Sequence, residues 1–177
     1  AEEPAVCRGV EGDAALKAAL LGAARTSGES LSPKELSARV RGVQSAREID
    51  GTLAAIAAAG AQARYVCASV TDPAALHAAL STVRAEWGPI RGIVHGAGVL
   101  ADRKIAEQTD AQFDLVWNTK VNGLRALLAA TAEDPLALLC LFSSVSARCG
   151  NNGQAAYAMA NEALNKVAQA EARRRPH

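Results

Sequence analysis

The spacing of hydrophobic residues divides the chain into helical segments and short apolar runs. Up to residue 60 the apolar positions recur every three or four residues, which predicts a helix over residues 11–24 and a longer one over residues 32–59. A proline in the first turn, Pro33, and a capping-box glutamate, Glu35, support the start of the second helix. We therefore expect residues 1–60 to form a helical segment that precedes the first strand of this chain.

After residue 60, short and mainly apolar runs alternate with amphipathic helical patterns. The apolar runs have the length and composition of buried strands and lie at residues 62–70, 90–95 and 136–142. The helical patterns lie at residues 72–88, 110–133 and 154–174. Strands that alternate with helices predict an α/β fold with a parallel, doubly wound sheet. We assign residues 61–177 to this sheet and its helices.

Composition narrows the classes of protein that the chain fits. Its 177 residues suffice for one domain, and half of them are hydrophobic although only 3% are aromatic. A net charge of +1, with dispersed basic residues apart from Arg173–Arg175, does not suggest nucleic-acid binding. No apolar run approaches the roughly 20 residues of a membrane span, and no signal peptide is recognisable. Because the chain begins without Met, we expect it to be an excerpt from a longer polypeptide.

The four cysteines show no CxxC pair and no regular spacing, which fits a reduced, cytoplasmic setting. Cys67 and Cys140 fall in predicted strands, so we expect both to be small core residues. A metal site is not expected at His95, because no second His or Cys stands at ligand spacing.

The residues with candidate chemistry lie in the last third of the chain. Ser144 follows the apolar run 136–142, and the carboxyl end of a parallel strand is where open α/β sheets bind ligands. Tyr157 comes thirteen residues later, and Asn161 follows it by four. On a helix this places Tyr157 and Asn161 about 6 Å apart on nearly the same face. Taken singly, Ser144 reads as a turn residue and Tyr157 as a surface residue, so the inference depends on their joint spacing.

These features, in this order, resemble the short-chain dehydrogenase/reductase superfamily. More closely they resemble the ketoreductase domains of polyketide synthases and polyunsaturated fatty acid synthases. The resemblance covers about residues 33–175 and depends on the loop at 95–102, the lysine-bearing segment 118–124 and the tyrosine-bearing segment 150–166. It implies a Rossmann-like fold that is incomplete here. The family's first two strands, its last strand and the Gly-x-Gly-x-x-Gly loop that holds the dinucleotide pyrophosphate have no counterpart in this sequence.

The resemblance also implies a set of catalytic roles. The reaction is the transfer of a hydride from a nicotinamide to a ketone, with a proton delivered to the oxygen. Tyr157 would donate that proton, with Lys120 as the cation beside it. Ser144 would hydrogen-bond the carbonyl oxygen as negative charge develops there. Asn161 would hold Lys120, a water molecule or the nicotinamide ribose.

Cofactor contacts follow from the same resemblance. The residues expected to bring backbone close to the cofactor, since glycine permits close approach, are His95, Gly96, Ala97 and Gly98. Ser69 stands beside Val70 where related sequences carry an aspartate that binds the adenine amino group. Replacing that charged acceptor by a hydroxyl is expected to weaken the hydrogen bond by roughly 1 kcal/mol.

For the intact domain the resemblance implies NADPH-dependent reduction of a 3-oxoacyl thioester on acyl carrier protein. The implied partners are that carrier-bound substrate and other synthase domains of the same polypeptide, with no nucleic acid and no membrane. The stretch Leu100–Asp102 partly matches a family signature for the (3R) alcohol. We expect the isolated chain to be inactive. The alternatives are a non-catalytic ketoreductase piece that scaffolds neighbouring domains, and a free-standing short-chain dehydrogenase acting on small alcohols.

Overall fold

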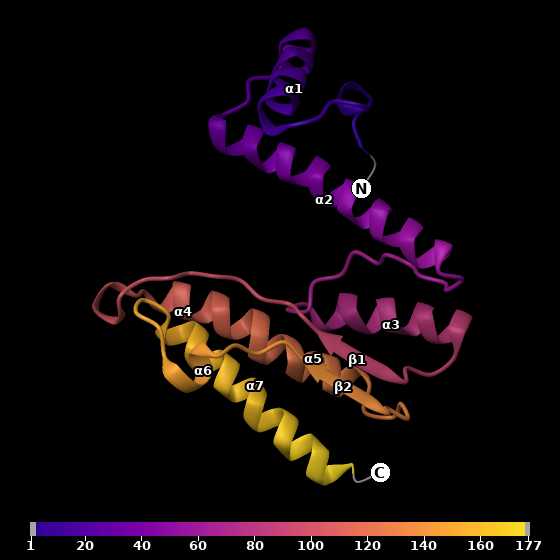
Figure 1. Ribbon diagram of the computed structural model, residues 1–177, viewed down its shortest axis with the longest axis vertical. Helices are drawn as coiled ribbons and strands as arrows, with labels where there is room; N and C mark the ends of the chain where they lie inside the picture. Colours follow the sequence, from indigo (N-terminus) through magenta and orange to yellow (C-terminus); the bar gives the residue numbers. More distant parts are fainter. Residues whose placement is uncertain (1–2, 176–177) are drawn as a thin grey trace. The chain divides into compact units, whose positions relative to one another are not determined.

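The computed structural model of the protein describes residues 3–175 and contains most of the predicted helices and two of the three predicted strands (Figure 1). The chain divides into two compact units, with the boundary between Val66 and Cys67. In the first unit the elements are η1 (Ala5–Cys7), α1 (Asp13–Ser27) and α2 (Pro33–Ala58). In the second they are α3 (Pro73–Trp87), β1 (Gly92–His95), η2 (Ile105–Glu107), α4 (Asp110–Trp117), η3 (Asn118–Asn122), α5 (Gly123–Ala130), β2 (Leu138–Leu141), α6 (Ser146–Cys149) and α7 (Ala155–Arg174).

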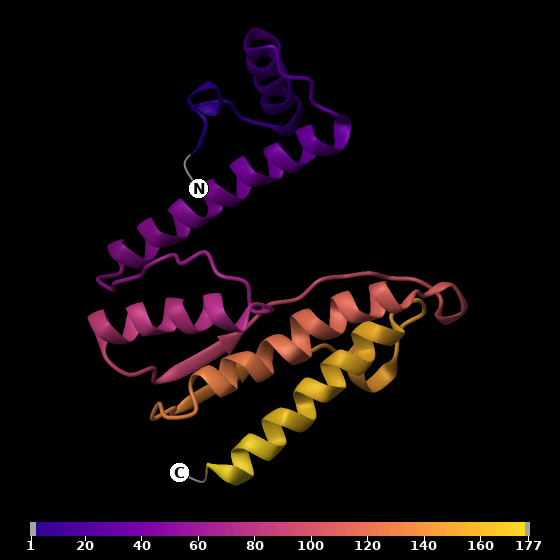
Figure 2. The same ribbon diagram turned by 180° about the vertical axis from the view of Figure 1, so that it is seen from behind.

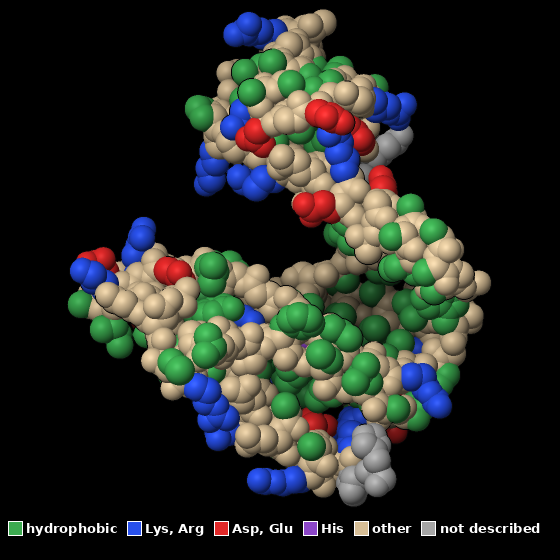
Figure 3. Space-filling view, viewed as in Figure 1, with side chains coloured by type: hydrophobic (Ala, Val, Ile, Leu, Met, Phe, Trp, Pro, Cys, Tyr) green, Lys and Arg blue, Asp and Glu red, His purple; other side chains and the backbone are tan. Residues whose placement is uncertain are grey.

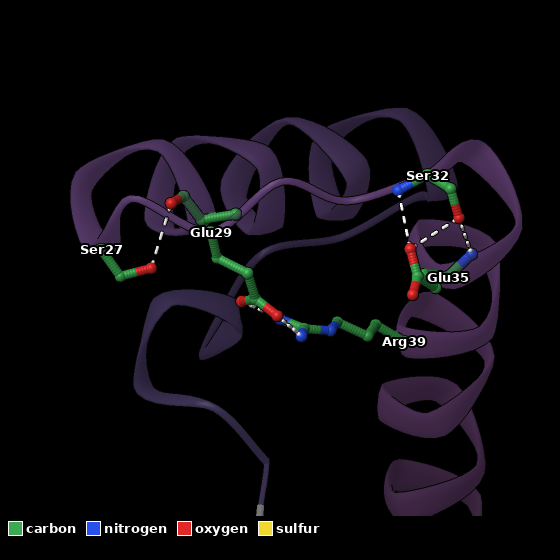
Figure 4. A network of polar contacts seen from close by, with 6 residues as sticks. Ser27, Glu29, Ser32, Glu35 and Arg39 are labelled. Carbon is green, nitrogen blue, oxygen red and sulfur yellow. Dashed lines mark hydrogen bonds and ion pairs between the residues drawn. The ribbon is translucent and has the colours of Figure 1, made fainter.

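The first unit is a helical pair whose start signals are readable in the sequence. The predicted capping box is confirmed: the Ser32 hydroxyl accepts from the Glu35 backbone at 3.3 Å, and the Ser32 backbone donates to the Glu35 carboxylate at 2.8 Å (Figure 4). The same close-up shows the ion pair of Arg39 with Glu29. Buried apolar side chains hold α1 against α2, namely Cys7, Leu16, Leu20, Leu36, Val40 and Val43.

The second unit is built on two parallel strands. Strands β1 and β2 pair in register from Gly92↔Leu138 to His95↔Leu141, and this brings their carboxyl ends to one edge. Helices α5 and α7 lie on one side of the strands in both views (Figures 1 and 2). Alternate residues of β1 therefore differ in burial: the side chain of His95 is 2% exposed, whereas Val94 on the opposite face is 62% exposed.

The uncovered face of the strands is apolar. Val94, Leu138 and Phe142 are all more than half exposed, and hydrophobic side chains gather over these strands in the space-filling view (Figure 3). An all-parallel sheet is normally covered by helices on both faces. The architecture is thus that of an incomplete Rossmann-like fold, as predicted.

Three sequence predictions need correction. The expected strand at 62–70 does not form, since residues 61–69 have no regular secondary structure and no strand lies beside them in the described part of the chain to complete their hydrogen bonds. Cys67 and Cys140 are exposed rather than core residues, because neither lies under a covering helix. The single helix expected at 110–133 is interrupted by the π-helical turn η3 and ends at Ala130.

Candidate active site

Lys120 lies in the π-helical turn η3, which joins α4 to α5. It is 4% exposed, and its Nζ donates a hydrogen bond to the Phe142 carbonyl, 3.1 Å away, just beyond the end of β2. Burial lowers the pKa of the Lys120 ammonium. The same Nζ lies 5.3 Å from the centre of the Tyr157 ring. Single π-turns within helices are frequent at functional sites, and this one turns a lysine inward toward the ends of the two strands.

A glycine makes room for this lysine. Gly98 belongs to the loop after β1, and a Cβ atom at this position would meet Lys120 Cε at 3.2 Å and Nζ at 3.5 Å. The absence of a side chain at Gly98 thus lets this loop lie close to Lys120, while its predicted approach to a cofactor stays a prediction.

Tyr157 and Asn161 are one turn apart on α7, as predicted. The Asn161 side-chain amide donates to the Tyr157 backbone carbonyl at 2.8 Å, and the Asn161 backbone carbonyl accepts from the Ser143 hydroxyl at 3.1 Å. Asn161 is fully buried, yet its Oδ1 has no hydrogen-bond partner among the described residues. A buried, unpaired acceptor costs about 1–3 kcal/mol, so this oxygen is an unfavourable feature of the packing around α7.

The hydrogen bonds of Ser144 lie within its own turn. Its Oγ accepts from the Ser146 backbone N–H at 3.2 Å and from the Ser146 hydroxyl at 2.9 Å. Because both bonds use the oxygen as acceptor, the Ser144 proton is left to donate elsewhere. The structure thus brings Lys120, Tyr157 and Asn161 together and holds Ser144 at the adjoining end of β2.

The remaining cofactor candidates lie around α3 and α5. Ser69 is exposed, and its hydroxyl shares a hydrogen bond of 2.8 Å with the Thr71 hydroxyl. Val70 packs against Gly123 at the start of α5. Beside it is a groove of about 500 Å³, whose lining includes Val70, Thr71, Asn118, Thr119 and Asn122. The contact of Ser69 and Val70 with a cofactor stays a prediction. Asp72 is the N-cap of α3, since its carboxylate accepts from the backbone N–H groups of Ala74 and Ala75 at 3.1 Å.

Two loops at the same edge of the sheet are joined by polar contacts. The Gln154 amide donates to the Asp102 carboxylate at 2.8 Å, and the Arg103 backbone donates to the Gly153 carbonyl at 2.8 Å. The Gln154 side chain thus links the loop before α7 to the loop after β1.

Sequence reasoning misses the partners that orient the candidate residues. The Phe142 carbonyl belongs to the backbone, so no residue type indicates its role. The contact of His95 with Lys120 joins residues 25 positions apart, which no local pattern predicts. Ser146 is recognisable only as the second member of a Ser-x-Ser pair.

Across residues 3–175, no group of three or more His, Cys, Asp or Glu side chains is arranged to hold a metal ion. No helix in that same range is long and apolar enough to cross a membrane.

Parallel strands, a glycine-containing loop at their carboxyl ends and a cluster of Lys, Tyr and Asn with a nearby Ser define a domain of the short-chain dehydrogenase/reductase class. Comparison with known proteins specifies the family. Residues 30–177 match the model of the KR domain, and the chain belongs to this family of ketoreductase domains.

Relatives of the chain are large synthases. It is 40% identical over 171 residues to a polyunsaturated fatty acid synthase polypeptide of Thraustochytrium sp., covering 93% of this chain and 6% of that protein. It is 37% identical over 133 residues to the phthioceranic/hydroxyphthioceranic acid synthase of Mycobacterium bovis, covering 75% of this chain and 6% of the synthase. The chain therefore spans only a small part of the curated relatives that it matches.

Among solved structures, an N-terminal ketoreductase from the macrolactin assembly line is similar to this chain. The two superpose with a TM-score of 0.68 at 33% sequence identity, over 71% of this chain and 26% of that one.

Proposed function

We propose that this chain is part of a ketoreductase domain that reduces a 3-oxoacyl thioester on acyl carrier protein to the 3-hydroxyacyl thioester, using NADPH. The observation that carries the proposal is the buried Lys120 ammonium at the carboxyl ends of both strands, 5.3 Å from the Tyr157 ring. A lysine that merely belonged to a surface helix would extend into water. The names of the relatives, which are multidomain synthases, support the substrate class and the partner domains.

The residues present fit the nicotinamide end of such a cofactor. The loop Gly96–Gly98, which lies beside Lys120, would hold it, and Ser69 and Val70 would face its adenine end. When bound, NADPH would supply the hydride.

The protein would supply the proton and stabilise the oxygen that receives it. The Tyr157 hydroxyl would give its proton to the carbonyl oxygen of the substrate. Lys120, held by the Phe142 carbonyl, would place a positive charge beside the resulting phenolate. Ser144, whose oxygen is already occupied by two donors, would direct its own proton to the same substrate oxygen. Positioned acid–base groups of this kind accelerate a reaction by roughly 10²–10⁴-fold.

The test is oxidation of NADPH by the full gene product in the presence of a 3-oxoacyl thioester. We expect Tyr157→Phe to abolish turnover while the protein stays folded. Tyr65→Phe makes the same chemical change at the other tyrosine of the chain, and we expect turnover to be unchanged. Equal turnover in wild type and Tyr157→Phe would overturn the proposal.

A second candidate is a non-catalytic domain that scaffolds its neighbours. Ser69, which stands in place of the family's aspartate, favours it. A folded gene product that neither oxidises NADPH nor responds to Tyr157→Phe would support this candidate. Activity on small alcohols without carrier protein would instead indicate a free-standing short-chain dehydrogenase.

For the isolated chain of residues 1–177 we propose that turnover is absent, because one face of its two-stranded sheet is uncovered.

A further inference from the structure

Three hydrogen bonds form a closed ring around Lys120. The His95 carbonyl accepts from the Phe142 backbone N–H at 3.0 Å, and the Phe142 carbonyl accepts from Lys120 Nζ at 3.1 Å. The third bond joins the Lys120 carbonyl to His95 Nε2 at 2.9 Å. Lys120 is thus held at both its backbone and its ammonium, and each anchor traces to the ends of the paired strands.

We propose that the His95 side chain is a positioning residue, which fixes the π-helical turn so that Lys120 lies beside Tyr157. The inference rests on the proposed reductase function. In this proposal the His95 imidazole holds Lys120 in place. The predicted approach to the cofactor is then made by the backbone of the 95–98 loop.

The chemistry of the contact determines which atom carries the proton. A carbonyl oxygen only accepts, so Nε2 of His95 must be the donor. Burial lowers the pKa of the His95 imidazole, and the positive charge of Lys120 lowers it further, although the hydrogen bond to the Lys120 carbonyl opposes these effects. The neutral Nε2–H form therefore suits this site, because it adds a donor without a second positive charge beside Lys120.

The geometry explains why a side-chain anchor is useful here. A π-turn is a local departure from regular helix, and without a tertiary contact the segment would relax toward α-helical geometry. Relaxation would rotate residue 120 around the helix axis and move its ammonium away from Phe142 and Tyr157. A displacement of about 1 Å in a catalytic group can cost roughly 10²-fold in rate.

The test compares variants of His95 in the full gene product, assayed with NADPH and a 3-oxoacyl thioester. We expect His95→Leu, which has no donor, to lower kcat by about 10- to 100-fold with little change in the KM for NADPH. His95→Gln places an amide donor near the position of Nε2, and we expect it to recover most of the loss. His77→Leu is the matched control, since His77 is an exposed histidine on α3. If His95→Leu does not fold, His95→Asn replaces it, because its shorter amide stays polar but falls short of the Lys120 carbonyl.

A double-mutant cycle separates positioning from general structural support. If His95 acts through Lys120, replacing His95 has no further effect on kcat in a Lys120→Met background. The inference would be overturned by full kcat in the donor-less variants, or by equal losses in the Gln and donor-less variants. It would also be overturned by additive effects in the cycle, or by a loss confined to the KM for NADPH. Wild-type protein without turnover would refute the proposed function itself, whereas turnover insensitive to His95 refutes only the positioning role.

Discussion

Replacing Gly123 by alanine tests whether the close contact at the start of α5 governs the stability of the second unit. Gly123 is buried, and a Cβ atom there would lie 2.8 Å from Val70 Cγ2 and 3.1 Å from Val70 Cβ. Val70 is β-branched and its Cβ cannot move without its backbone, so the segment must shift. Overpacking of this kind costs about 1–3 kcal/mol, and the better helix propensity of alanine returns about 1 kcal/mol. We expect a net loss of about 1 kcal/mol in the free energy of unfolding.

Urea denaturation followed by circular dichroism measures this loss. The matched control is Gly51→Ala on α2, where nothing lies within 4 Å of the added methyl group and where we expect a gain of about 0.5–1 kcal/mol. The pair Gly123→Ala with Val70→Ala removes the obstructing branch, and we expect the double variant to lose less stability than the sum of the single changes. If Gly123→Ala unfolds at the same or a higher urea concentration than wild type, the clash does not limit stability and the reasoning fails.

The Arg84 guanidinium holds the pKa of the Asp134 carboxyl below its usual range. Their contact therefore stabilises the fold at neutral pH, and this stabilisation is lost as the pH falls below about 4 and passes through the depressed pKa. Asp134→Asn should therefore cost about 1–3 kcal/mol at pH 7 and flatten the acid limb of a stability-versus-pH curve, and an unaltered limb would count against this assignment. Ser146→Ala removes the hydroxyl that donates to Ser144. We expect kcat to fall about three- to tenfold with the KM for NADPH unchanged. An unchanged kcat would show that the contact is dispensable. Ser32→Ala removes the N-cap of α2, and we expect thermal unfolding to show a loss of about 1 kcal/mol; unchanged stability would contradict a stabilising role for this cap.

Local signals determined the parts of this protein that the sequence predicts well. The capping box at Ser32 and the N-cap at Asp72 satisfy backbone groups within three residues of themselves, so their outcome does not depend on distant chain. The one-turn spacing of Tyr157 and Asn161 likewise survives in α7 because helix geometry alone sets it. The order of strand, glycine loop and candidate residues was enough to indicate the family.

Contacts between distant segments decided the rest. Residues 62–70 have the composition of a strand, but a strand exists only when a neighbour completes its hydrogen bonds, and no strand lies beside them in the described chain. The π-turn at Lys120 has no sequence signal and appears together with contacts to His95 and Phe142, which lie more than 20 residues away on either side. The sequence by itself thus determined which residues are the candidates for the chemistry and on which elements they lie. Only the tertiary structure decided that the ammonium of Lys120 turns inward, because that direction depends on hydrogen bonds from two other segments.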